Sequence, residues 1–534
     1  MLSAIGIRTT VAAAVFLSFV EFAVPSFAEA ATISDCKEIS RLDFGSKAKI
    51  LSALPISVLG GDKDPSWLPT RYLDSLRSMP PFCRIVAVST PAEDSRIGIE
   101  IWLPLSKWNG RLLGTGSGGY PVAIDYRALI DGLQKGFAVA NTDLGLAAHM
   151  SELHQSASND VTTLFINHPE RMVDFGSRAT HEMTLLAKEL IERFYGRPAE
   201  WSYFTGCSTG GMQALREVEQ FPEDYNGVLA GDPGENRARI HLSILWDYMI
   251  VWHRPDRILA NIQLEAMHSA VISACNGTSK DPFLRTPLKC NWRPESLLCG
   301  PAGGVCLTPN QVEAANLIYQ GPHNPRTREQ YYPGLVRGSE LGWNMYMTQA
   351  NHEPPFRGVF AFALGEAFQF ETFDWDRDAE TFIAAIGPYL DATNTDMTAF
   401  RQRGGKLLLY HGGSDPLASM ENTVNFFTKA GGEDDPKTNS PYALLFVLPG
   451  MDHCQGGLGP DHFDQMSAIM RWTEHGSAPI PLSVWKQGAS GAGTQGLCPY
   501  STAGSISRNQ SRLQCHDEQA TSPMTRSLET HDAK

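Results

Sequence analysis

Short, nearly continuous runs of hydrophobic residues recur along the chain, and each ends near a Gly or an Asp. Such runs are typical of strands that are buried on both faces of a parallel sheet. Helix-like stretches lie between them, and the clearest, residues 177–196, places Met183, Leu186, Leu190 and Phe194 on one face. This alternation predicts an α/β fold with a layered sheet. The predicted strands are residues 111–116, 137–143, 201–206, 227–233, 406–415 and 443–450.

The alternation stops between residues 235 and 400. This interval has no evident strand ladder, is dense in aromatic residues and contains a cluster of four cysteines. We therefore predict an insertion between two strands of the sheet. The chain then divides into a leader at 1–30, a first core segment at 31–234, the insertion at 235–400, and a second core segment with a C-terminal tail at 401–534.

The N-terminus has the pattern of a secretory signal peptide. Arg8 precedes the apolar run of residues 11–20, which is too short to span a bilayer, and the small-residue site Ala28-Glu29-Ala30 follows. We expect cleavage near Ala31 and a secreted or periplasmic protein. No later segment looks long and apolar enough to anchor the chain, so we expect no membrane association after the leader is removed.

Composition narrows the possible partners and the compartment. The formal net charge of −14 argues against a basic surface for nucleic acid. The ten cysteines are an even number, as expected for disulfides in an oxidising compartment, and none forms a Cys-x-x-Cys pair. They stand at Cys36, Cys83, Cys207, Cys275, Cys290, Cys299, Cys306, Cys454, Cys498 and Cys515.

The clearest chemical motif is Gly-x-Ser-x-Gly at residues 206–210, between a predicted strand and a helix-like stretch. This context is typical of the turn that presents a nucleophilic serine, here Ser208, although an ordinary glycine-rich turn has the same pattern. A serine nucleophile needs a base and an orienting acid, in the chain order Ser, Asp or Glu, His. Asp415 ends a predicted strand and His453 follows the next one, so we predict a triad of Ser208, Asp415 and His453.

Three other assignments stay open at this point. Asp452 adjoins His453, but adjacent residues rarely face each other well enough for the orienting bond. His411 also lies at a strand end and is the alternative base, although it would leave Asp415 without a clear role. Cys207 is a possible nucleophile if its thiol is free, but its side chain would have to point where that of Ser208 points.

An oxyanion hole is expected beside the serine. The backbone N–H of Thr209 supplies one donor, and the glycine-rich segment 114–120 supplies another from Gly118 or Gly119. The simpler interpretation of this segment is a plain loop or a phosphate-binding loop. It lacks the Lys-Ser/Thr of a P-loop and the spacing of a dinucleotide-binding loop.

These segments resemble the tannase and feruloyl esterase family, whose mark is a cysteine directly before the serine and another directly after the histidine. The resemblance rests on "GCSTGG" at 206–211, "HGGSDPLAS" at 411–419 and "HC" at 453–454, and it covers most of the mature chain. It implies an α/β-hydrolase core with a large lid inserted between the nucleophile and acid strands. It also implies hydrolysis of esters of aromatic carboxylic acids.

The resemblance further implies five disulfides, and this chain departs from the family in two places. The implied pairs are Cys207–Cys454, Cys36–Cys83, Cys275–Cys290, Cys299–Cys306 and Cys498–Cys515. Met212 stands where relatives often carry Arg. In the family's calcium loop, Asn276 and Ser279 replace carboxylates and only Asp281 remains near, so we expect no calcium and no other cofactor. An EF-hand loop starting at Asp374 would need Gly at its sixth position, where the chain has Ala379.

The sequence therefore predicts a secreted serine esterase that acts on a small aromatic ester through an acyl-enzyme on Ser208. The alternative is a non-catalytic binder with the same fold, whose lid holds an aromatic or sugar ligand. Most aromatic residues of the insertion are expected to form its own core, with a few against the acyl group. They include Trp246, Trp252, Trp292, Trp343, Phe368, Phe370 and Trp375.

Overall fold

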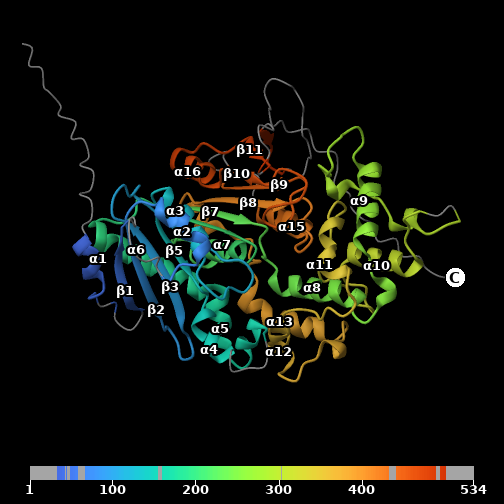
Figure 1. Cartoon of the computed structure of the whole chain (residues 1–534), viewed down its shortest axis with the longest axis horizontal. Helices are drawn as coiled ribbons and strands as arrows, with labels where there is room; N and C mark the ends of the chain where they lie inside the picture. The colour runs from blue at the N-terminus through green and yellow to red at the C-terminus, as the bar shows by residue number, and fades with distance from the viewer. Residues whose placement is uncertain are drawn as a thin grey trace, which may run out of the picture.

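The computed structural model describes residues 33–500, except 43, 45–47, 58–65, 154–158, 302–303, 432–440, 487 and 489–493. The predicted leader at 1–30 and Cys515 lie outside the described residues. A large twisted sheet occupies one side of the molecule, and a mostly helical body containing α8 to α11 lies beside it (Figure 1).

Nine strands form the main sheet in the order β1-β2-β3-β5-β4-β6-β7-β8-β9. The first three strands are antiparallel to their neighbours, whereas β5, β4, β6, β7, β8 and β9 are parallel. The bounds are β1 (Ala48–Ile56), β2 (Phe82–Ser89), β3 (Ile97–Pro104), β4 (Arg111–Thr115), β5 (Ala138–Thr142), β6 (Trp201–Cys207), β7 (Gly227–Gly231), β8 (Lys406–Gly412) and β9 (Ala443–Leu448). A small antiparallel sheet contains β10 (His462–Phe463), β11 (Leu482–Trp485) and β12 (Gln495–Leu497).

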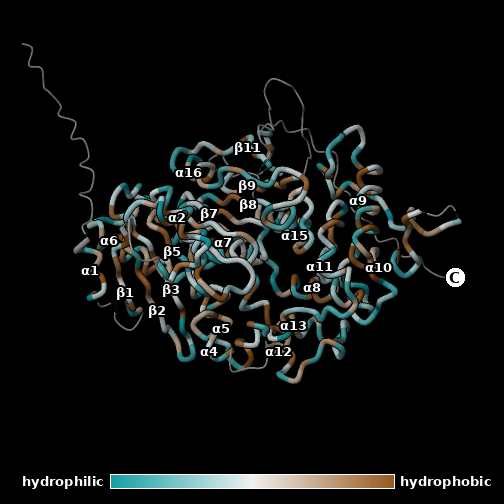
Figure 2. Tube along the Cα trace, in the orientation of Figure 1, coloured by the Kyte–Doolittle hydropathy of each residue, from teal (hydrophilic) through white to brown (hydrophobic). Residues whose placement is uncertain are grey.

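The six strands predicted from the sequence are confirmed as β4 to β9, and they are the parallel part of the sheet. Their continuous apolar runs follow from burial on both faces. In β8, Leu407 and Leu409 belong to one hydrophobic core while Leu408 and Tyr410 belong to another on the opposite face. Figure 2 shows hydrophobic positions along the strands of the sheet and also in helices such as α9 and α10.

Helices cover both faces of the sheet. The helices α6, α7 and α15 contribute to one core, and α2, α3 and α16 contribute to the other. The predicted helix at 177–196 is confirmed as α6, which ends at Gly196 with a φ of 69°. The helix bounds are α1 (Ile33–Ile39), α2 (Leu73–Arg77), α3 (Tyr126–Gln134), α4 (Met150–Leu153), α5 (Pro169–Val173), α6 (Ala179–Tyr195), α7 (Thr209–Gln220), α8 (Arg237–Val251), α9 (Asn261–Cys275), α10 (Pro309–Gln320), α11 (Asn344–Met347), α12 (Arg357–Leu364), α13 (Asp378–Leu390), α14 (Thr398–Gln402), α15 (Met420–Ala430) and α16 (Gln465–His475).

Between β7 and β8 the described residues form helices α8 to α14 and no strand. Trp343 is fully buried in a separate core that also includes Met267 and Trp292, and Phe368 and Phe370 pack in the core shared with the sheet. These four aromatic residues therefore form cores, as expected for most aromatic residues of the insertion. The division of the chain at residues 235 and 400 stays a prediction.

One helical segment in this region, Pro255–Cys275, is long and apolar enough to cross a membrane by length and composition alone. This finding is contrary to our expectation that no segment after the leader qualifies. Leu264, Met267 and Val271 of this segment are buried in the core of the helical body. The same composition is found in core helices, so the segment is weak evidence for a membrane span.

Candidate active site

Ser208 occupies a strained turn between β6 and α7. Its φ of 62° and ψ of −117° are rare for a residue with a side chain. The turn is tight because a Cβ on Gly206 would lie 2.5 Å from the carbonyl oxygen of Gly210. The backbone N–H of Ser208 donates to the Gly231 carbonyl at 2.9 Å. The half-buried serine is thus held at the carboxyl end of the parallel strands.

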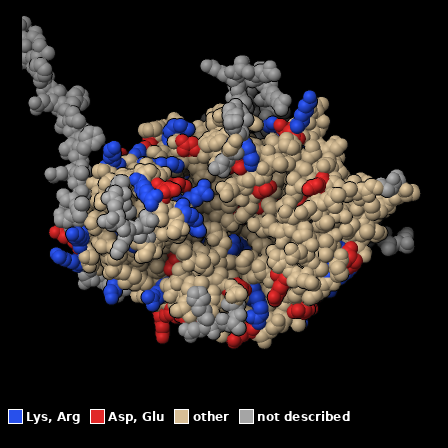
Figure 3. Space-filling view, in the orientation of Figure 1, with Lys and Arg blue, Asp and Glu red and all other residues tan. Residues whose placement is uncertain are grey.

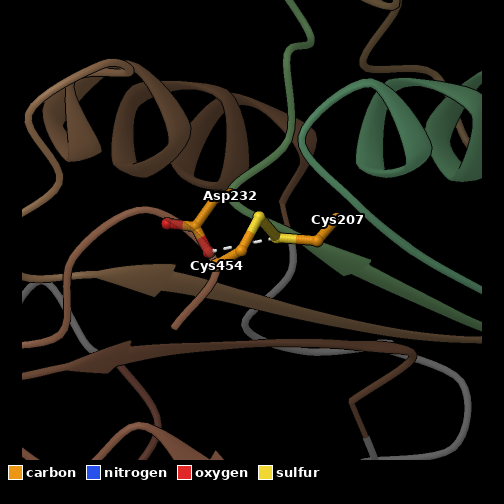
Figure 4. A group of neighbouring side chains, drawn as sticks. All are labelled: Cys207, Asp232 and Cys454. Carbon is orange, nitrogen blue, oxygen red and sulfur yellow. Dashed lines mark hydrogen bonds between the residues drawn. A yellow bond between two sulfur atoms is a disulfide. The ribbon is translucent and has the colours of Figure 1, made fainter. Parts of the chain in front are cut away.

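A disulfide joins this turn to the loop that follows β9. Cys207 and Cys454 are bonded with their Cα atoms 6.0 Å apart, although they are 247 positions apart in the sequence (Figure 4). Cys207 directly precedes Ser208, and Cys454 directly follows His453. The bond therefore brings the proposed nucleophile and base segments together. It also leaves Cys207 without a free thiol, which removes the alternative of a cysteine nucleophile.

Asp415 and His453 form the hydrogen bond expected of an orienting acid and a base. His453 Nδ1 lies 2.6 Å from Asp415 Oδ2. The other carboxylate oxygen of Asp415 accepts from the backbone N–H groups of Leu417 and Ala418, at 2.7 and 3.0 Å. Because Nδ1 is engaged with Asp415, Nε2 of His453 is left to face a nucleophile.

Electrostatics favour an ionised Asp415 and a protonatable His453. Burial raises the pKa of Asp415, but the positive fields of His453 and His411 and the hydrogen bonds from both rings outweigh it and hold the pKa far below its ordinary value. Burial lowers the pKa of His453, but the Asp415 carboxylate outweighs this and leaves the pKa above its ordinary value. The pair is therefore suited to stabilise an imidazolium that forms during proton transfer.

The alternatives to this assignment have other partners. The buried His411 has Nδ1 3.0 Å from Thr423 Oγ1 and Nε2 3.1 Å from the Ala418 carbonyl oxygen. Both ring nitrogens of His411 therefore have partners already, and neither is available to accept a proton from Ser208. Asp452 makes no hydrogen bond to His453 within the described residues, and burial raises its pKa to about 6.

Asp232 is a site residue that sequence reasoning missed. It is fully buried, and its Oδ1 accepts from the Gly412 N–H at 2.8 Å. Its Oδ2 lies 3.5 Å from Cys207 Sγ (Figure 4), and this sulfur carries no hydrogen because it is in the disulfide. The contact is therefore a hydrogen bond only when Asp232 is protonated, and burial raises the pKa of Asp232 to about 7. Asp232 comes directly after β7, and an Asp at the end of a predicted strand is the pattern that identified Asp415. The same pattern could have identified Asp232 from the sequence.

Buried polar groups continue behind the triad. His411 Nε2 lies 3.3 Å from Asp415 Oδ2 and 3.8 Å from Asp232 Oδ1. Burial lowers the pKa of His411, but the two carboxylates outweigh this and raise the pKa to about 9. His411 is thus a buried cation that lies between the acids Asp232 and Asp415 and is stabilised by their negative charge.

The predicted oxyanion donors lie next to the nucleophile turn. Thr209 is the first residue of α7, so its N–H has no acceptor within the helix. Its hydroxyl donates to the Gly119 carbonyl at 2.8 Å, which fixes the glycine-rich segment against the turn. Within this segment Gly116 lies closest to the nucleophile turn, and a Cβ there would be 2.6 Å from the Cα of Gly210. Gly118 and Gly119 have open space instead, and Gly119 has a φ of 59° that suits glycine.

A family model described as tannase and feruloyl esterase matches residues 83–520 of this chain. The chain belongs to the tannase and feruloyl esterase family. It is 30% identical over 453 residues to an uncharacterized esterase of Xanthomonas campestris pv. campestris, covering 76% of this chain and 77% of the relative. It is 27% identical over 442 residues to feruloyl esterase B of Aspergillus niger, covering 78% and 82% of the two chains.

A solved structure of feruloyl esterase B from Aspergillus oryzae is similar over 88% of this chain and 95% of that chain, with a TM-score of 0.76 and 25% identity. The fold is that of the α/β-hydrolase esterases, as the sequence predicted. The protein is a carboxylic ester hydrolase of the feruloyl esterase and tannase type.

The disulfides of the family resemblance are present wherever both partners are described. Besides Cys207–Cys454, the structure contains Cys36–Cys83, Cys275–Cys290 and Cys299–Cys306. Cys498 is also disulfide-bonded, and its expected partner Cys515 lies outside the described residues.

The loop where relatives are expected to bind calcium has a different set of contacts here. Asp281 Oδ2 accepts hydrogen bonds from Arg285 Nε and Ser279 Oγ, both at 2.7 Å. The side-chain amide of Asn276 donates to the Asp281 carbonyl at 2.6 Å. Calcium needs several oxygen ligands, usually including more than one carboxylate. A loop whose single carboxylate is paired with an arginine does not fit this ion.

Proposed function

We propose that the protein is exported and hydrolyses esters of aromatic carboxylic acids, of the feruloyl or galloyl type, through an acyl-enzyme on Ser208. The observation that carries this proposal is the Asp415–His453 hydrogen bond of 2.6 Å, in a loop that the Cys207–Cys454 disulfide ties to the residue before Ser208. The fungal feruloyl esterases that the chain resembles, and its four described disulfides, are consistent with an extracellular protein.

In this mechanism Ser208 Oγ attacks the ester carbonyl carbon while His453 Nε2 takes the hydroxyl proton. Asp415 stabilises the resulting imidazolium. The N–H groups of Thr209 and of Gly118 or Gly119 bind the oxyanion of the tetrahedral intermediate. His453 then protonates the leaving alcohol, and the acyl-enzyme is hydrolysed by a water molecule that His453 activates.

The mechanism requires no metal ion, and we propose that none is bound in the insertion. The Arg285 guanidinium already provides a positive charge at Asp281. The catalytic steps described above use only the hydroxyl of Ser208, the His453–Asp415 pair and backbone N–H groups.

The test is hydrolysis of methyl ferulate and methyl gallate by the wild type and by Ser208→Ala. We expect the variant to lose on the order of 10⁴-fold or more in kcat because the nucleophile is absent. Circular dichroism and thermal unfolding should show that the variant remains folded. A fluorophosphonate probe should label the wild type and not Ser208→Ala. Unchanged turnover in the variant would refute the mechanism, and a folded wild type that neither turns over nor reacts would favour the non-catalytic binder.

A further inference from the structure

Asp232 is a buried acid that lies against the disulfide between Cys207 and Cys454. The side chain is fully buried, and its Oδ2 is 3.5 Å from Cys207 Sγ, the contact drawn in Figure 4. Its Oδ1 accepts the Gly412 N–H at 2.8 Å. Because Oδ1 is engaged in this way, the proton of a protonated Asp232 is expected on Oδ2, next to the sulfur. The steps of ester hydrolysis described above do not use this proton.

The disulfide beside Asp232 is within reach of small molecules in solution. Cys207 and Cys454 are both partly exposed, whereas the disulfide-bonded Cys36 and Cys83 are fully buried. A thiol from solution can therefore approach the sulfur of Cys454. Cys207 Sγ, the sulfur that such an attack would release, is the one that contacts the carboxyl group of Asp232.

The charged groups around Asp232 allow it to hold or release a proton near neutral pH. Burial raises its pKa to about 7; the positive His411 opposes this rise, Asp415 adds to it and His453 opposes it. Burial also raises the pKa of the neighbouring Tyr410 phenol, which is therefore uncharged at this pH. The ordinary pKa of a cysteine thiol is about 8.5, so a protonated Asp232 is acidic enough to give its proton to a thiolate.

We propose that Asp232 is a catalytic acid for thiol–disulfide exchange at the Cys207–Cys454 bond. This is a second reaction of the protein, distinct from ester hydrolysis, and its co-substrate is a small dithiol. The geometry that carries the proposal is the contact between a buried carboxyl oxygen and the sulfur that leaves. A leaving thiolate that receives a proton as the bond breaks is a better leaving group than one that must carry its charge.

The exchange takes place in two steps. A thiolate of the dithiol first attacks Cys454 Sγ, the bond between the two protein sulfurs breaks, and its electron pair goes to Cys207 Sγ. Asp232 Oδ2 gives its proton to that sulfur and is later reprotonated from water. The second thiol of the reagent, as a thiolate, then attacks the reagent's own sulfur in the mixed disulfide and releases Cys454, which takes a proton from water. The protein disulfide is thus reduced to two thiols, and the dithiol is oxidised to a disulfide.

The experiment measures how fast dithiothreitol reduces each disulfide of the folded protein between pH 6 and pH 8. Samples are quenched with N-ethylmaleimide, and the labelled cysteines are quantified by mass spectrometry of their peptides. Dithiothreitol carries no charge besides its thiolate, which limits steering by the basic and acidic side chains that Figure 3 shows interspersed on one face of the molecule. Each rate constant is divided by the thiolate fraction of the reagent at that pH, so that the remaining pH dependence comes from the protein.

The wild-type protein alone provides the first test. With a pKa of about 7, the protonated fraction of Asp232 falls about tenfold between pH 6 and pH 8. The corrected rate constant for Cys207–Cys454 should therefore also fall about tenfold over this interval. The Cys299–Cys306 disulfide in the same samples is the internal control, because it closes a separate loop in the insertion, and its corrected rate constant should stay constant. A corrected rate constant for Cys207–Cys454 that does not change with pH would overturn the proposal.

Asp232→Asn keeps the size of the side chain but has no proton to give. At pH 6 its corrected rate constant for Cys207–Cys454 should be about tenfold or more below that of the wild type, and it should not change with pH. Asp452→Asn is the matched control: it removes another acid, two positions before Cys454, that makes no hydrogen bond to either sulfur within the described residues. This control should keep the wild-type rate constant and its pH dependence. Equal rate constants for the wild type and Asp232→Asn at pH 6, or a loss of the pH dependence in Asp452→Asn, would show that Asp232 is not the acid.

Reduction of this disulfide should also stop ester hydrolysis, and this consequence rests on the proposed function. Turnover of methyl ferulate should fall in parallel with the appearance of the Cys207 thiol, because His453 is then no longer tied to the nucleophile turn. The thiol measurements do not depend on turnover. A protein that hydrolyses no ester but shows the expected thiol kinetics would refute the proposed function and support the role of Asp232. Ester hydrolysis together with pH-independent reduction would refute the role of Asp232 alone.

Discussion

Two histidines share the carboxylate of Asp415, but they differ in what their other nitrogen does. His453 contacts Asp415 through Nδ1 and keeps Nε2 available. His411 places Nδ1 against Thr423 and Nε2 against the Ala418 carbonyl. The sequence identified both as strand-end candidates and favoured His453 on chain order. It could not show that His411 is enclosed as a cation, because burial and bonding partners depend on elements far apart in the chain.

The pH dependence of activity should report the state of His453. Its pKa is above the ordinary value because the Asp415 carboxylate outweighs burial. Only the neutral ring can accept the Ser208 proton, so kcat/KM for methyl ferulate should rise with pH and reach half its maximum above pH 6.5, the ordinary histidine value. The measurement is a pH–rate profile with an ester that does not ionise.

A variant of His411 provides the control for this profile. The positive His411 opposes protonation of His453, so His411→Gln should raise the pKa of His453 and shift the half-maximal pH upward. Glutamine can still bond to Thr423 or to the Ala418 carbonyl, which favours a folded variant. A downward shift, or a wild-type profile with its midpoint below the ordinary histidine value, would contradict this assignment.

At the scale of elements, the parallel strands were predictable and the antiparallel ones were not. The strands β4 to β9 are buried on both faces, so their sequences are continuous apolar runs. In β2 and β3, Arg84 and Glu100 interrupt the apolar pattern. They are buried as an ion pair at 2.6 Å. From sequence alone, a charged residue in a strand is expected to be exposed to solvent. Its burial becomes understandable only when the neighbouring strand, which carries the oppositely charged partner, is known.

The Cys207–Cys454 disulfide joins the end of β6 to the loop that follows β9, and its removal should lower activity even under conditions where the protein remains folded. Replacement of both cysteines by Ala should lower kcat for methyl ferulate about 100-fold, because small displacements of a catalytic base are that costly. The loss of stability is about 5 kcal/mol in the chain-entropy account for so long a loop. Activity and circular dichroism are measured at a temperature where the variant is folded.

The matched control for this disulfide is the Cys299–Cys306 pair in the insertion, which closes a short loop of separation 7. Its double Ala variant also removes one disulfide, but it leaves the loop of His453 tied to the nucleophile turn. We expect nearly wild-type kcat from it. Similar losses in the two double variants would show that the Cys207–Cys454 bond has no special role in positioning.

The contacts of Asp281 predict that the stability of the protein does not depend on calcium. Because Arg285 pairs with Asp281, chelation by EDTA should leave the midpoint of thermal unfolding within about 1 °C of the value in calcium chloride, well below the shift that a saturated ligand causes. Differential scanning fluorimetry of the wild type measures this directly. Arg285→Gln should lower the midpoint under both conditions. A midpoint that falls by several degrees only in EDTA would show that calcium is bound after all.

Across the whole molecule, buried carboxyl groups should make the protein less stable as the pH rises, whereas its activity should increase with pH. Burial raises the pKa of Asp232 and Glu235 to about 7, of Glu219 to about 8 and of Asp391 to about 6. A raised pKa in the folded state means that folding favours the protonated form. The contribution of these groups to the free energy of unfolding is complete below about pH 4, the pKa of carboxyl groups in the unfolded chain. It is lost as the pH rises toward their pKa values in the folded protein.

The free energy of unfolding should therefore decrease between about pH 5 and pH 8, by on the order of 1 kcal/mol or more, while kcat/KM increases over the same interval. The net charge of −14 acts in the same direction, since further ionisation adds to self-repulsion. Urea unfolding at a series of pH values measures how steeply the free energy of unfolding changes with pH.

Glu219→Gln should make this change less steep, because Glu219 Oε1 is buried without a hydrogen-bond partner and folding opposes the ionisation of this side chain. A stability that rises from pH 5 to pH 8 would mean that these carboxyl groups are already ionised in the folded protein. The polar groups behind the triad would then carry more negative charge than His411 alone can balance.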